Sequence, residues 1–498
     1  MLIAAIDQGS SSTKGALLDE RGAVRARAEA PVGLRREGDT ASHDAEELLA
    51  SVAQVLVELS RAGAADAVAL ACQRSTCLLW ERDGGRPLTR ALSWQDLSAT
   101  ERVAGLQPHA AEIAARTGLR LSPYYAGGKL GLLLDATRGA RAGAERGEVV
   151  AGTLDAFLVH RLTGQASTEP GHAGRTLLYA LDEGRWDEGL AGRFGIPLAA
   201  LPELLPSAGP RGSVRRGALA DGALAGVPLL ALLGDQQAAL VGNGGSGAAA
   251  GDERVAVAHF GTGAFTLVEV GEAPRRHEGL LAAVAWSQAA SRRFQLEGSV
   301  NSAGSAVDWA LRLVGAGVDL LAEVGGGELD PERLPAFLPA FVGLGAPWWR
   351  PAPGALLGGI SFATGGRELL ATVLAGVAQR LCDCLEAFAA AGMAPAVVRA
   401  SGRLASLPGL AGLLADLSGL SVEVVAEEEA GVRGAARLAA LAAAALPAAA
   451  LGATPPLRLR RAPHWDAARR LRVRRSWGDF VAAAGAAAAG STGPKPLM

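Results

Sequence analysis

The chain has 498 residues, more than one hydrophobic core usually spans, so we expect two domains. Its 48 Lys and Arg residues nearly balance its 50 Asp and Glu residues, and the formal net charge of -2 provides no general attraction to nucleic acid or to an anionic membrane. The four cysteines show neither a disulfide framework nor paired Cys-x-x-Cys zinc spacing. These features favour a cytoplasmic protein with buried thiols and a small-molecule partner.

Residues 4–18 predict a strand, a short turn rich in hydroxyl groups, and a second strand. Gly9 and the serines after it let backbone N–H groups and hydroxyls approach an anion closely, which suits a phosphate. The candidate ligands are Ser10, Ser11, Ser12 and Lys14, with Asp7 as a carboxylate for a metal or its bound water. An ordinary tight turn explains this segment equally well when it is taken alone.

A second strand, turn and strand follow at residues 255–268, around Gly261, Thr262 and Gly263. Two such hairpins, each opening one half of the chain, indicate a duplicated nucleotide-binding architecture. The stretch 242–252 before the second hairpin is glycine-rich and nearly uncharged, which is typical of a flexible boundary. Its match to G-x-G-x-x-G lacks the strand and helix of a dinucleotide fold, and G-x-x-x-x-G-K-[ST] does not occur. We therefore predict domains at 1–243 and 244–482, with a flexible tail at 483–498.

Helical and apolar segments alternate in both halves of the chain, which indicates the α/β class and two similar lobes facing one cleft. We expect helices at 45–60, 304–314, 368–390, 406–417 and 431–445, strands at 68–72 and 396–400, and a strand leading into a helix over 149–162. The uncharged stretch 438–457 is mostly alanine and contains three prolines, so we interpret it as a helix end and a loop.

Nine short motifs occur in an order that resembles the FGGY carbohydrate kinases, most of all their glycerol kinase branch. They are 7–14 (DQGSSSTK), 73–76 (QRST), 94–96 (WQD), 122–129 (SPYYAGGK), 152–155 (GTLD), 234–240 (GDQQAAL), 260–263 (FGTG), 297–300 (EGSV) and 343–349 (GLGAPWW). The resemblance extends from the first strand to the region of Trp477. It implies two actin-like, ribonuclease H-type α/β lobes with ATP and substrate in the cleft between them.

Asp235 is the candidate catalytic base, because phosphorylating an alcohol at neutral pH requires a carboxylate within reach of the hydroxyl proton. The residue follows the apolar run 227–233 and Gly234, where a strand would deliver it to the edge of a cleft. An Asp after Gly is as often a turn former or a helix N-cap, so the residues alone leave both interpretations open. The resemblance implies the catalytic role.

The resemblance implies a role for each other candidate. The nucleotide-binding residues would be Ser10, Ser11, Ser12, Lys14, Gly261, Thr262, Gly263, Gly304, Asp308, Gly402 and Arg403. The substrate pocket would contain Arg74, Ser75, Trp94, Tyr124, Asp235, Gln236 and Phe265. Mg²⁺ would be organised by Asp7 through water and by Asp235. Core packing explains Trp94, Phe265 and Gly304 as well, and Lys14 also fits a surface lysine.

Two positions depart from the family pattern. Glycerol kinases have a glutamate after the pocket arginine, where it binds a terminal hydroxyl, and this chain has Ser75. The shorter side chain removes a charge-assisted acceptor and leaves room for a tetritol, a ketotetrose or a pentulose. In the glycine loop that faces adenine, Gly402 is followed by Arg403. If the second glycine is needed for a positive φ or for close approach to the base, Arg403 weakens ATP binding or rearranges the loop. Otherwise Arg403 stacks on adenine or reaches a phosphate.

The sequence thus predicts an ATP-dependent kinase that phosphorylates a primary hydroxyl of a small polyol or ketose. One alternative is a pentulokinase of the xylulose or ribulose type. An alternative of another class is a catalytically silent nucleotide-binding protein, since this fold also serves actin and chaperone ATPases. We expect no nucleic-acid partner and no membrane insertion, and the family resemblance implies a homodimer or homotetramer.

Overall fold

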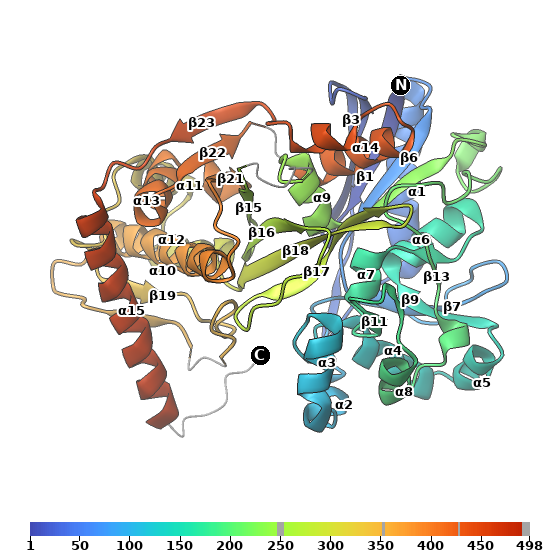
Figure 1. The fold of residues 1–498 in the computed structure, drawn as a ribbon, viewed down its shortest axis with the longest axis horizontal. Helices are drawn as coiled ribbons and strands as arrows, with labels where there is room; N and C mark the ends of the chain where they lie inside the picture. The colour runs from blue at the N-terminus through green and yellow to red at the C-terminus, as the bar shows by residue number, and fades with distance from the viewer. Residues whose placement is uncertain (247–252, 351–353, 427–428, 491–498) are drawn as a thin grey trace.

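A computed structural model describes residues 1–246, 253–350, 354–426 and 429–490. The chain forms two lobes side by side (Figure 1). We call the elements from β1 to α9 the N-lobe and those from β15 to α15 the C-lobe. Each lobe is built on its own sheet, and the two sheets determine where the candidate site residues lie.

The main N-lobe sheet has the strand order β14-β6-β1-β2-β3. Its strands are β1 (Leu2–Gln8), β2 (Ser12–Asp19), β3 (Val24–Pro31), β6 (Ala67–Cys72) and β14 (Leu229–Gly234). β1, β2 and β3 run antiparallel, whereas β6 and β14 are parallel to β1. The strands β1 and β6 are almost wholly apolar and buried, as expected for strands covered on both faces. Helix α1 (Ala45–Ala62) packs on β1, β2 and β3 after an N-cap at Asp44.

The C-lobe sheet repeats this order and adds one strand at each edge. It runs β17-β18-β16-β15-β21-β22-β23. The strands are β15 (Val255–Phe260), β16 (Ala264–Gly271), β17 (Leu281–Gln288), β18 (Ser291–Val300), β21 (Val397–Ser401), β22 (Ser421–Val425) and β23 (Leu457–Arg461). Without the edge strands β17 and β23, both the order and the strand directions match those of the N-lobe. The predicted α/β class and the duplicated two-lobe architecture are confirmed.

Further elements extend each lobe. The N-lobe insertion between β6 and β14 contains β7 (Cys77–Glu81), β8 (Ala91–Leu92), β9 (Val149–Thr153), β10 (Ser167–Thr168), β11 (Tyr179–Ala180), β12 (Arg185–Trp186), β13 (Glu203–Leu204), α2 (Thr100–Ala104), α3 (Ala110–Thr117), α4 (Ala126–Ala136), α5 (Ala140–Glu145), α6 (Leu154–Thr163), α7 (Pro170–Gly174) and α8 (Glu188–Phe194). Strands β4 (Arg35–Glu37) and β5 (Thr40–His43) join β7, β8 and β9 in a second sheet. The C-lobe adds α10 (Gly304–Leu313), α11 (Val318–Gly326), β19 (Ala336–Leu338), β20 (Leu356–Gly358), α12 (Gly366–Ala390), α13 (Pro408–Ser418) and α15 (Ala467–Gly490).

The lobes exchange a helix at their interface. Helix α9 (Asp235–Gly242) follows the N-lobe strand β14 and reaches β15, β16 and β17 of the C-lobe. Helix α14 (Ala430–Ala442) follows the C-lobe strand β22 and packs on β1, β6 and β14 of the N-lobe (Figure 1). The two helices approach so closely that a methyl group at Gly242 would lie 2.0 Å from the Ala430 carbonyl oxygen. One apolar core therefore joins both lobes.

Two predicted boundaries differ from the structure. Residues 243–246, expected to begin a flexible linker, are buried, and Arg399 donates hydrogen bonds to the carbonyl oxygens of Asn243 and Gly244. The rest of that stretch, 247–252, lies outside the described residues. Helix α15 continues to Gly490, so the tail predicted to begin at 483 starts inside a helix. Among the described residues, no helix is both long and apolar enough to span a membrane.

Candidate active site

Two tight hairpins lie at corresponding ends of the two sheets. In the N-lobe hairpin, the Gly9 N–H donates to the Ser12 carbonyl oxygen at 3.0 Å. In the C-lobe hairpin, the Gly261 N–H donates to the Gly263 carbonyl oxygen at 2.9 Å. Helix α10 begins directly on the second hairpin, where a methyl group at Gly304 would lie 2.5 Å from the Gly261 carbonyl oxygen. Only glycine allows this approach, so Gly304 has a packing role, and its nucleotide-binding role stays a prediction.

Three charged candidates converge beside the N-lobe hairpin. Asp7 and Lys14 are paired across β1 and β2, and Asp235 begins α9. The pKa of Asp7 is raised to about 7, mainly by burial and next by the negative charge of Asp235, while Lys14 opposes the shift. Two carboxylates that repel each other at a strand end form a place where a cation is favourable.

Asp235 is held by one of its two oxygens. Oδ1 accepts a hydrogen bond from the Gln236 N–H at 2.8 Å and lies 3.2 Å from Nε of Arg74. Oδ2 has no hydrogen bond or ion pair to any residue in the described ranges. The Asp235 side chain is 32% exposed, so this second oxygen is available to a ligand.

Helix α14 supplies a glycine to the same place. A methyl group at Gly431 would lie 2.1 Å from Oδ2 of Asp7, closer than any real contact. The sequence predicts only that a helix begins at residue 431. Gly431 instead allows a C-lobe helix to approach a carboxylate of the N-lobe.

The substrate candidate Arg74 is buried in an ion-pair cluster that spans both lobes. Its guanidinium donates to both oxygens of Glu297, at 2.7 and 3.2 Å, and Arg175 also donates to Glu297. Burial would raise the pKa of Glu297, but Arg175 and Arg74 together lower it to about 2. The Phe265 ring lies beside Arg74, 5.9 Å from its guanidinium carbon to the ring centre. A buried charge needs such partners, and this cluster orients Arg74 toward Asp235.

An aromatic wall and a buried lysine complete the predicted substrate pocket. The rings of Trp94 and Tyr124 lie 5.7 Å apart. Lys129 of α4 is completely buried and donates to the carbonyl oxygens of Ser75, Ser93 and Tyr124 at 2.9, 2.9 and 3.1 Å. It thus joins three pocket loops. The signal in the sequence was a single lysine in an otherwise uncharged helix start.

Ser10 connects the predicted substrate pocket to the N-lobe hairpin. Its hydroxyl donates to Oε1 of Gln73 at 3.1 Å and accepts from Nε1 of Trp94 at 2.8 Å. The Ser10 side chain is therefore engaged with protein groups, whereas Ser11 next to it is exposed. Of the serines predicted to bind phosphate, Ser11 has the side chain most open to a ligand, and Ser12 begins β2.

The two departures from the family pattern have different structural outcomes. Ser75 adopts a positive φ of 65°, is fully buried, and its hydroxyl has no hydrogen-bond partner. Gln236 likewise has an unpartnered buried oxygen, Oε1. Unsatisfied buried polar atoms beside Arg74 and Asp235 are the kind that a polyol hydroxyl satisfies.

At the other departure, glycine is required one residue earlier than Arg403. Gly402 has φ of 94°, and a methyl group there would lie 2.2 Å from the Phe260 carbonyl oxygen. Arg403 begins a short 3-10 helix without a positive φ, so the backbone at this position does not require glycine. Its guanidinium donates to Oδ1 of Asp308 at 2.6 Å, and both side chains are exposed. The two nucleotide candidates therefore pair with each other at the rim of the C-lobe.

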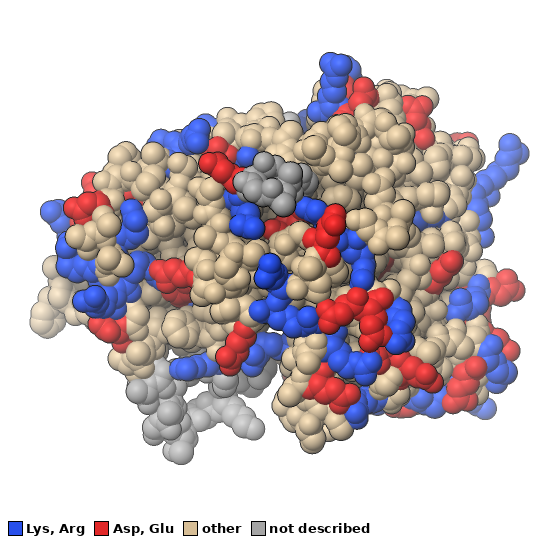
Figure 2. All heavy atoms as spheres, in the orientation of Figure 1, with Lys and Arg blue, Asp and Glu red and all other residues tan. Residues whose placement is uncertain are grey.

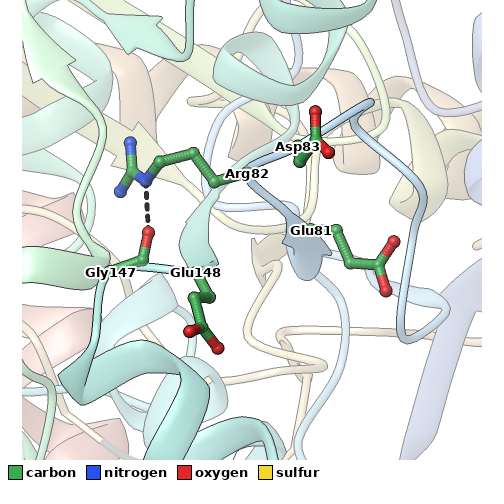
Figure 3. A pocket seen from close by; sticks show the side chains of 5 residues that line it. All are labelled: Glu81, Arg82, Asp83, Gly147 and Glu148. Carbon is green, nitrogen blue, oxygen red and sulfur yellow. Dashed lines mark hydrogen bonds between the residues drawn. The ribbon is translucent and has the colours of Figure 1, made fainter.

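Charges of both signs are interspersed over the face in Figure 2. One surface depression, of about 640 Å³, is lined by Glu81, Arg82, Asp83, Gly147 and Glu148 (Figure 3). It lies at the opposite end of β7 from the pocket residues that precede Cys77. Arg82 donates to the Gly147 carbonyl oxygen at 2.6 Å, and Glu81 and Glu148 are paired with neighbouring arginines. This depression contains none of the predicted site residues.

Comparisons with known proteins identify the family of this chain. The N-terminal domain model of the FGGY family of carbohydrate kinases matches residues 2–242, and the C-terminal domain model matches 256–443. A glycerol kinase of Thermus brockianus is 39% identical, over 95% of this chain and 96% of its own. A glycerol kinase of Xanthobacter autotrophicus is 37% identical, over 88% and 90%. The crystal structure of Plasmodium falciparum glycerol kinase with ADP superposes with a TM-score of 0.87 at 24% identity, over 97% and 98%. This chain is therefore a carbohydrate kinase and a member of the FGGY family.

Proposed function

We propose that the protein transfers the terminal phosphoryl group of ATP to a primary hydroxyl of a small polyol, with glycerol as the first candidate. The observation that carries this proposal is the meeting of Asp7, Lys14 and Asp235 at one end of the N-lobe sheet, next to the Arg74 cluster. The glycerol kinase relatives support the choice of a polyol.

Asp235 acts as the general base in this proposal. Its Oδ1 is occupied by Arg74 and by the Gln236 N–H, so Oδ2 is the oxygen left to accept the proton of the substrate hydroxyl. Arg74 holds Asp235 in place, and Glu297 holds Arg74 in place. A positioned base of this type accelerates proton transfer by roughly 10²- to 10⁴-fold.

Mg²⁺ fits the residues at the end of β1. Among the described residues no group of three His, Cys, Asp or Glu side chains could hold a metal ion. Mg²⁺ at phosphoryl-transfer sites usually takes only one or two carboxylates and completes its shell with water and phosphate oxygens. Asp7 and Asp235 are such a pair, since the negative charge of Asp235 contributes to the raised pKa of Asp7. When bound, the ion supplies positive charge to the phosphoryl oxygens.

The two hairpins and Lys14 would hold the phosphates. Backbone N–H groups around Ser11 and Thr262 provide directional donors, and Lys14 provides a positive charge beside Asp7. We further propose that Ser75 adapts the pocket to a polyol longer than glycerol. Its unpartnered hydroxyl supports this, since a further substrate hydroxyl would satisfy it.

A coupled assay of ADP release with glycerol, erythritol, xylulose and ribulose tests the proposal. We expect turnover with glycerol or erythritol that exceeds turnover with either pentulose. Higher turnover with a pentulose would replace the proposal by a pentulokinase. Nucleotide binding without turnover on any substrate would indicate the silent nucleotide-binding alternative.

Ser75→Glu sharpens the substrate assignment, because it restores the family residue beside the pocket arginine. We expect the ratio of kcat/KM for glycerol to kcat/KM for erythritol to rise in this variant. An unchanged ratio would remove Ser75 from the specificity argument.

Two other expectations remain proposals. A cytoplasmic location is supported by four cysteines that are all free and buried, as suits a reducing compartment. A homodimer or homotetramer rests on the family resemblance alone, and sedimentation of the purified protein measures it.

A further inference from the structure

His259 is a half-buried imidazole at the C-lobe hairpin, and the proposed mechanism gives it no role. It lies on β15, two residues before Gly261, and its charge environment includes Asp235 and Lys14 of the other lobe. The position that a methyl group at Gly261 would take is 3.9 Å from Nε2 of His259. Nε2 therefore faces the turn of the hairpin, and it has no hydrogen-bond partner among the residues that the structure describes.

The other ring nitrogen is held by a chain of hydrogen bonds whose direction can be deduced. Nη2 of Arg433 donates to Oδ1 of Asn243 at 3.3 Å, and arginine can only donate. The Asn243 amide is thereby oriented so that Nδ2 donates to Oγ of Ser401, at 3.2 Å. Nδ1 of His259 lies 3.1 Å from the same oxygen. It is the only acceptor for the Ser401 hydroxyl proton in the described ranges.

This series of hydrogen bonds sets the tautomer of His259. Because Ser401 donates to Nδ1, Nδ1 carries no proton, and the ring proton of the neutral imidazole resides on Nε2. Burial lowers the pKa of His259, which Asp235 opposes and Lys14 reinforces, so the neutral form is favoured at neutral pH. The hairpin therefore receives an N–H donor without an added positive charge.

We propose that His259 is a phosphate-binding residue, whose Nε2–H donates to a terminal phosphate oxygen of the nucleotide, and that Asn243 and Ser401 are positioning residues that keep the proton on Nε2. This inference rests on the proposed function for the identity of the ligand. A donor aimed at an oxygen that gains charge during transfer stabilises the transition state more than the ground state. The loss therefore falls mainly on kcat.

The first test observes the ring directly and needs no turnover. The protein is labelled with ¹⁵N at histidine, and the His259 signals are assigned by their absence in His259→Gln. We expect the spectrum of the Nε2–H tautomer, and a shift of the Nε2–H signal on addition of ADP or of a non-hydrolysable ATP analogue, but not of AMP. A wild-type protein with the proton on Nδ1, or with a signal that neither nucleotide moves, would overturn the proposal.

The second test reverses the direction of the hydrogen bond between Ser401 and His259. In Asn243→Asp the new carboxylate accepts from both Arg433 and Ser401, so Ser401 must accept from Nδ1–H of His259 and Nε2 loses its proton. We expect this variant to show the Nδ1–H spectrum and to lose as much kcat as His259→Phe. Retention of the Nε2–H spectrum would refute the positioning role of Asn243.

The third test measures the donor itself. His259→Phe keeps the ring and should lower kcat about a hundredfold with little change in the KM for the polyol, in line with the loss of one oxyanion donor. His259→Gln, which places an amide N–H near the Nε2 position, should recover part of that loss. His464→Gln, at an exposed histidine, is the matched control and should be unchanged.

The outcomes separate this inference from the proposed function. If the wild-type protein phosphorylates a polyol and His259→Phe and His259→Gln lose kcat equally, the kinase proposal stands and the donor role of His259 is removed. A nucleotide-dependent shift of Nε2–H in a protein that phosphorylates no polyol would support the phosphate contact and remove the kinase proposal instead.

Discussion

The two hairpins occupy equivalent places in sheets of the same order, yet they present opposite chemistry. In the N-lobe, the pair one step before the turn is Asp7 opposite Lys14. In the C-lobe, the equivalent pair is His259 opposite Phe265. The parallel neighbour of Asp7 is Ala71, whereas that of His259 is Ser401. The backbone framework is thus shared, while the N-lobe edge is charged and the C-lobe edge is neutral.

In the proposed mechanism, this difference divides the work of one reaction between the two lobes. Proton removal and cation binding need carboxylates, and these gather on the N-lobe side with Asp235. Holding phosphates needs donors that do not repel a cation, and a neutral edge meets that requirement. The C-lobe carboxylate nearest to Arg74, Glu297, is neutralised by two arginines.

The largest expected effect comes from the charged edge. Asp235→Asn removes the base and should lower kcat about 10³-fold, or about 4 kcal/mol of transition-state stabilisation, while ADP affinity stays near that of wild type. Steady-state kinetics and calorimetric titration with ADP measure both quantities. Asp83→Asn, in the depression of Figure 3, is the matched control. Turnover preserved in Asp235→Asn would assign the base to another group.

Glu297→Gln tests whether the buried C-lobe carboxylate between Arg74 and Arg175 is structural. It leaves Arg74 and Arg175 without their shared partner and should lower the free energy of unfolding by about 3 kcal/mol at pH 7. Because the folded-state pKa of Glu297 is about 2, below the ordinary 4.5, the stability it contributes is lost as the pH falls from 4.5 toward 2. Denaturant titrations should show that the unfolding free energies of Glu297→Gln and wild type approach each other as the pH falls over that range.

The exposed pair of Glu323 and Arg367 provides the control for that experiment. Glu323→Gln should change stability by less than about 0.5 kcal/mol. An equally small change in stability for Glu297→Gln would contradict the role of Glu297 as the shared partner of Arg74 and Arg175.

Gly431→Ala tests the contact by which the C-lobe reaches the charged edge. The added methyl group would displace Asp7, so we expect a loss of about 2 kcal/mol in unfolding free energy together with a fall in kcat. Gly412→Ala, in α13, has nothing within 4 Å of the added carbon and should stabilise the protein by up to about 1 kcal/mol. Equal thermal shifts in the two variants would show that the contact does not constrain Asp7.

The smallest effect concerns the pH dependence of the charged edge. The pKa of Asp7 rises from 3.8 to about 7 on folding, so its ionisation opposes folding and stability is lost as the pH rises through this range. Asp7 keeps partial exposure, which reduces the effect. Without nucleotide or Mg²⁺, Asp7→Asn should be about 1 kcal/mol more stable than wild type at pH 8 and closer to wild type at pH 5. A gain that is the same at both pH values would place the effect elsewhere.

The sequence predicts the hairpins well, because glycine and hydroxyl residues between apolar runs are local signals. The helices that it predicts, such as α1 and α12, agree with the structure to within a few residues. The ion pair of Arg74 with Glu297 joins residues 223 positions apart, and no local pattern indicates it. His259 looked like part of a strand, and only the parallel pairing of β15 with β21 brings Ser401 beside it.

The absence of a local signal for long-range contacts also explains why residues 243–246 are buried although a flexible linker was expected there. Residues 243–246 have the composition of a flexible segment, but Arg399, far along the chain, binds their carbonyl oxygens. Ser75 is a related case, since its positive φ is set by its surroundings rather than by its residue type. Composition describes what a segment prefers, and tertiary contacts decide what it adopts.

The exchange of α9 and α14 makes the two halves mutually dependent as folding units. A fragment ending near residue 243 would leave the alanine-rich strands β1 and β6 without the helix that covers them. Such a truncated product should aggregate by itself and become soluble only when the complementary fragment is co-expressed. Chimaeras of this protein therefore need to take both α9 and α14 from one parent. The interface between these helices and the lobes is also where the proposed reacting groups, Asp7 and Asp235, lie.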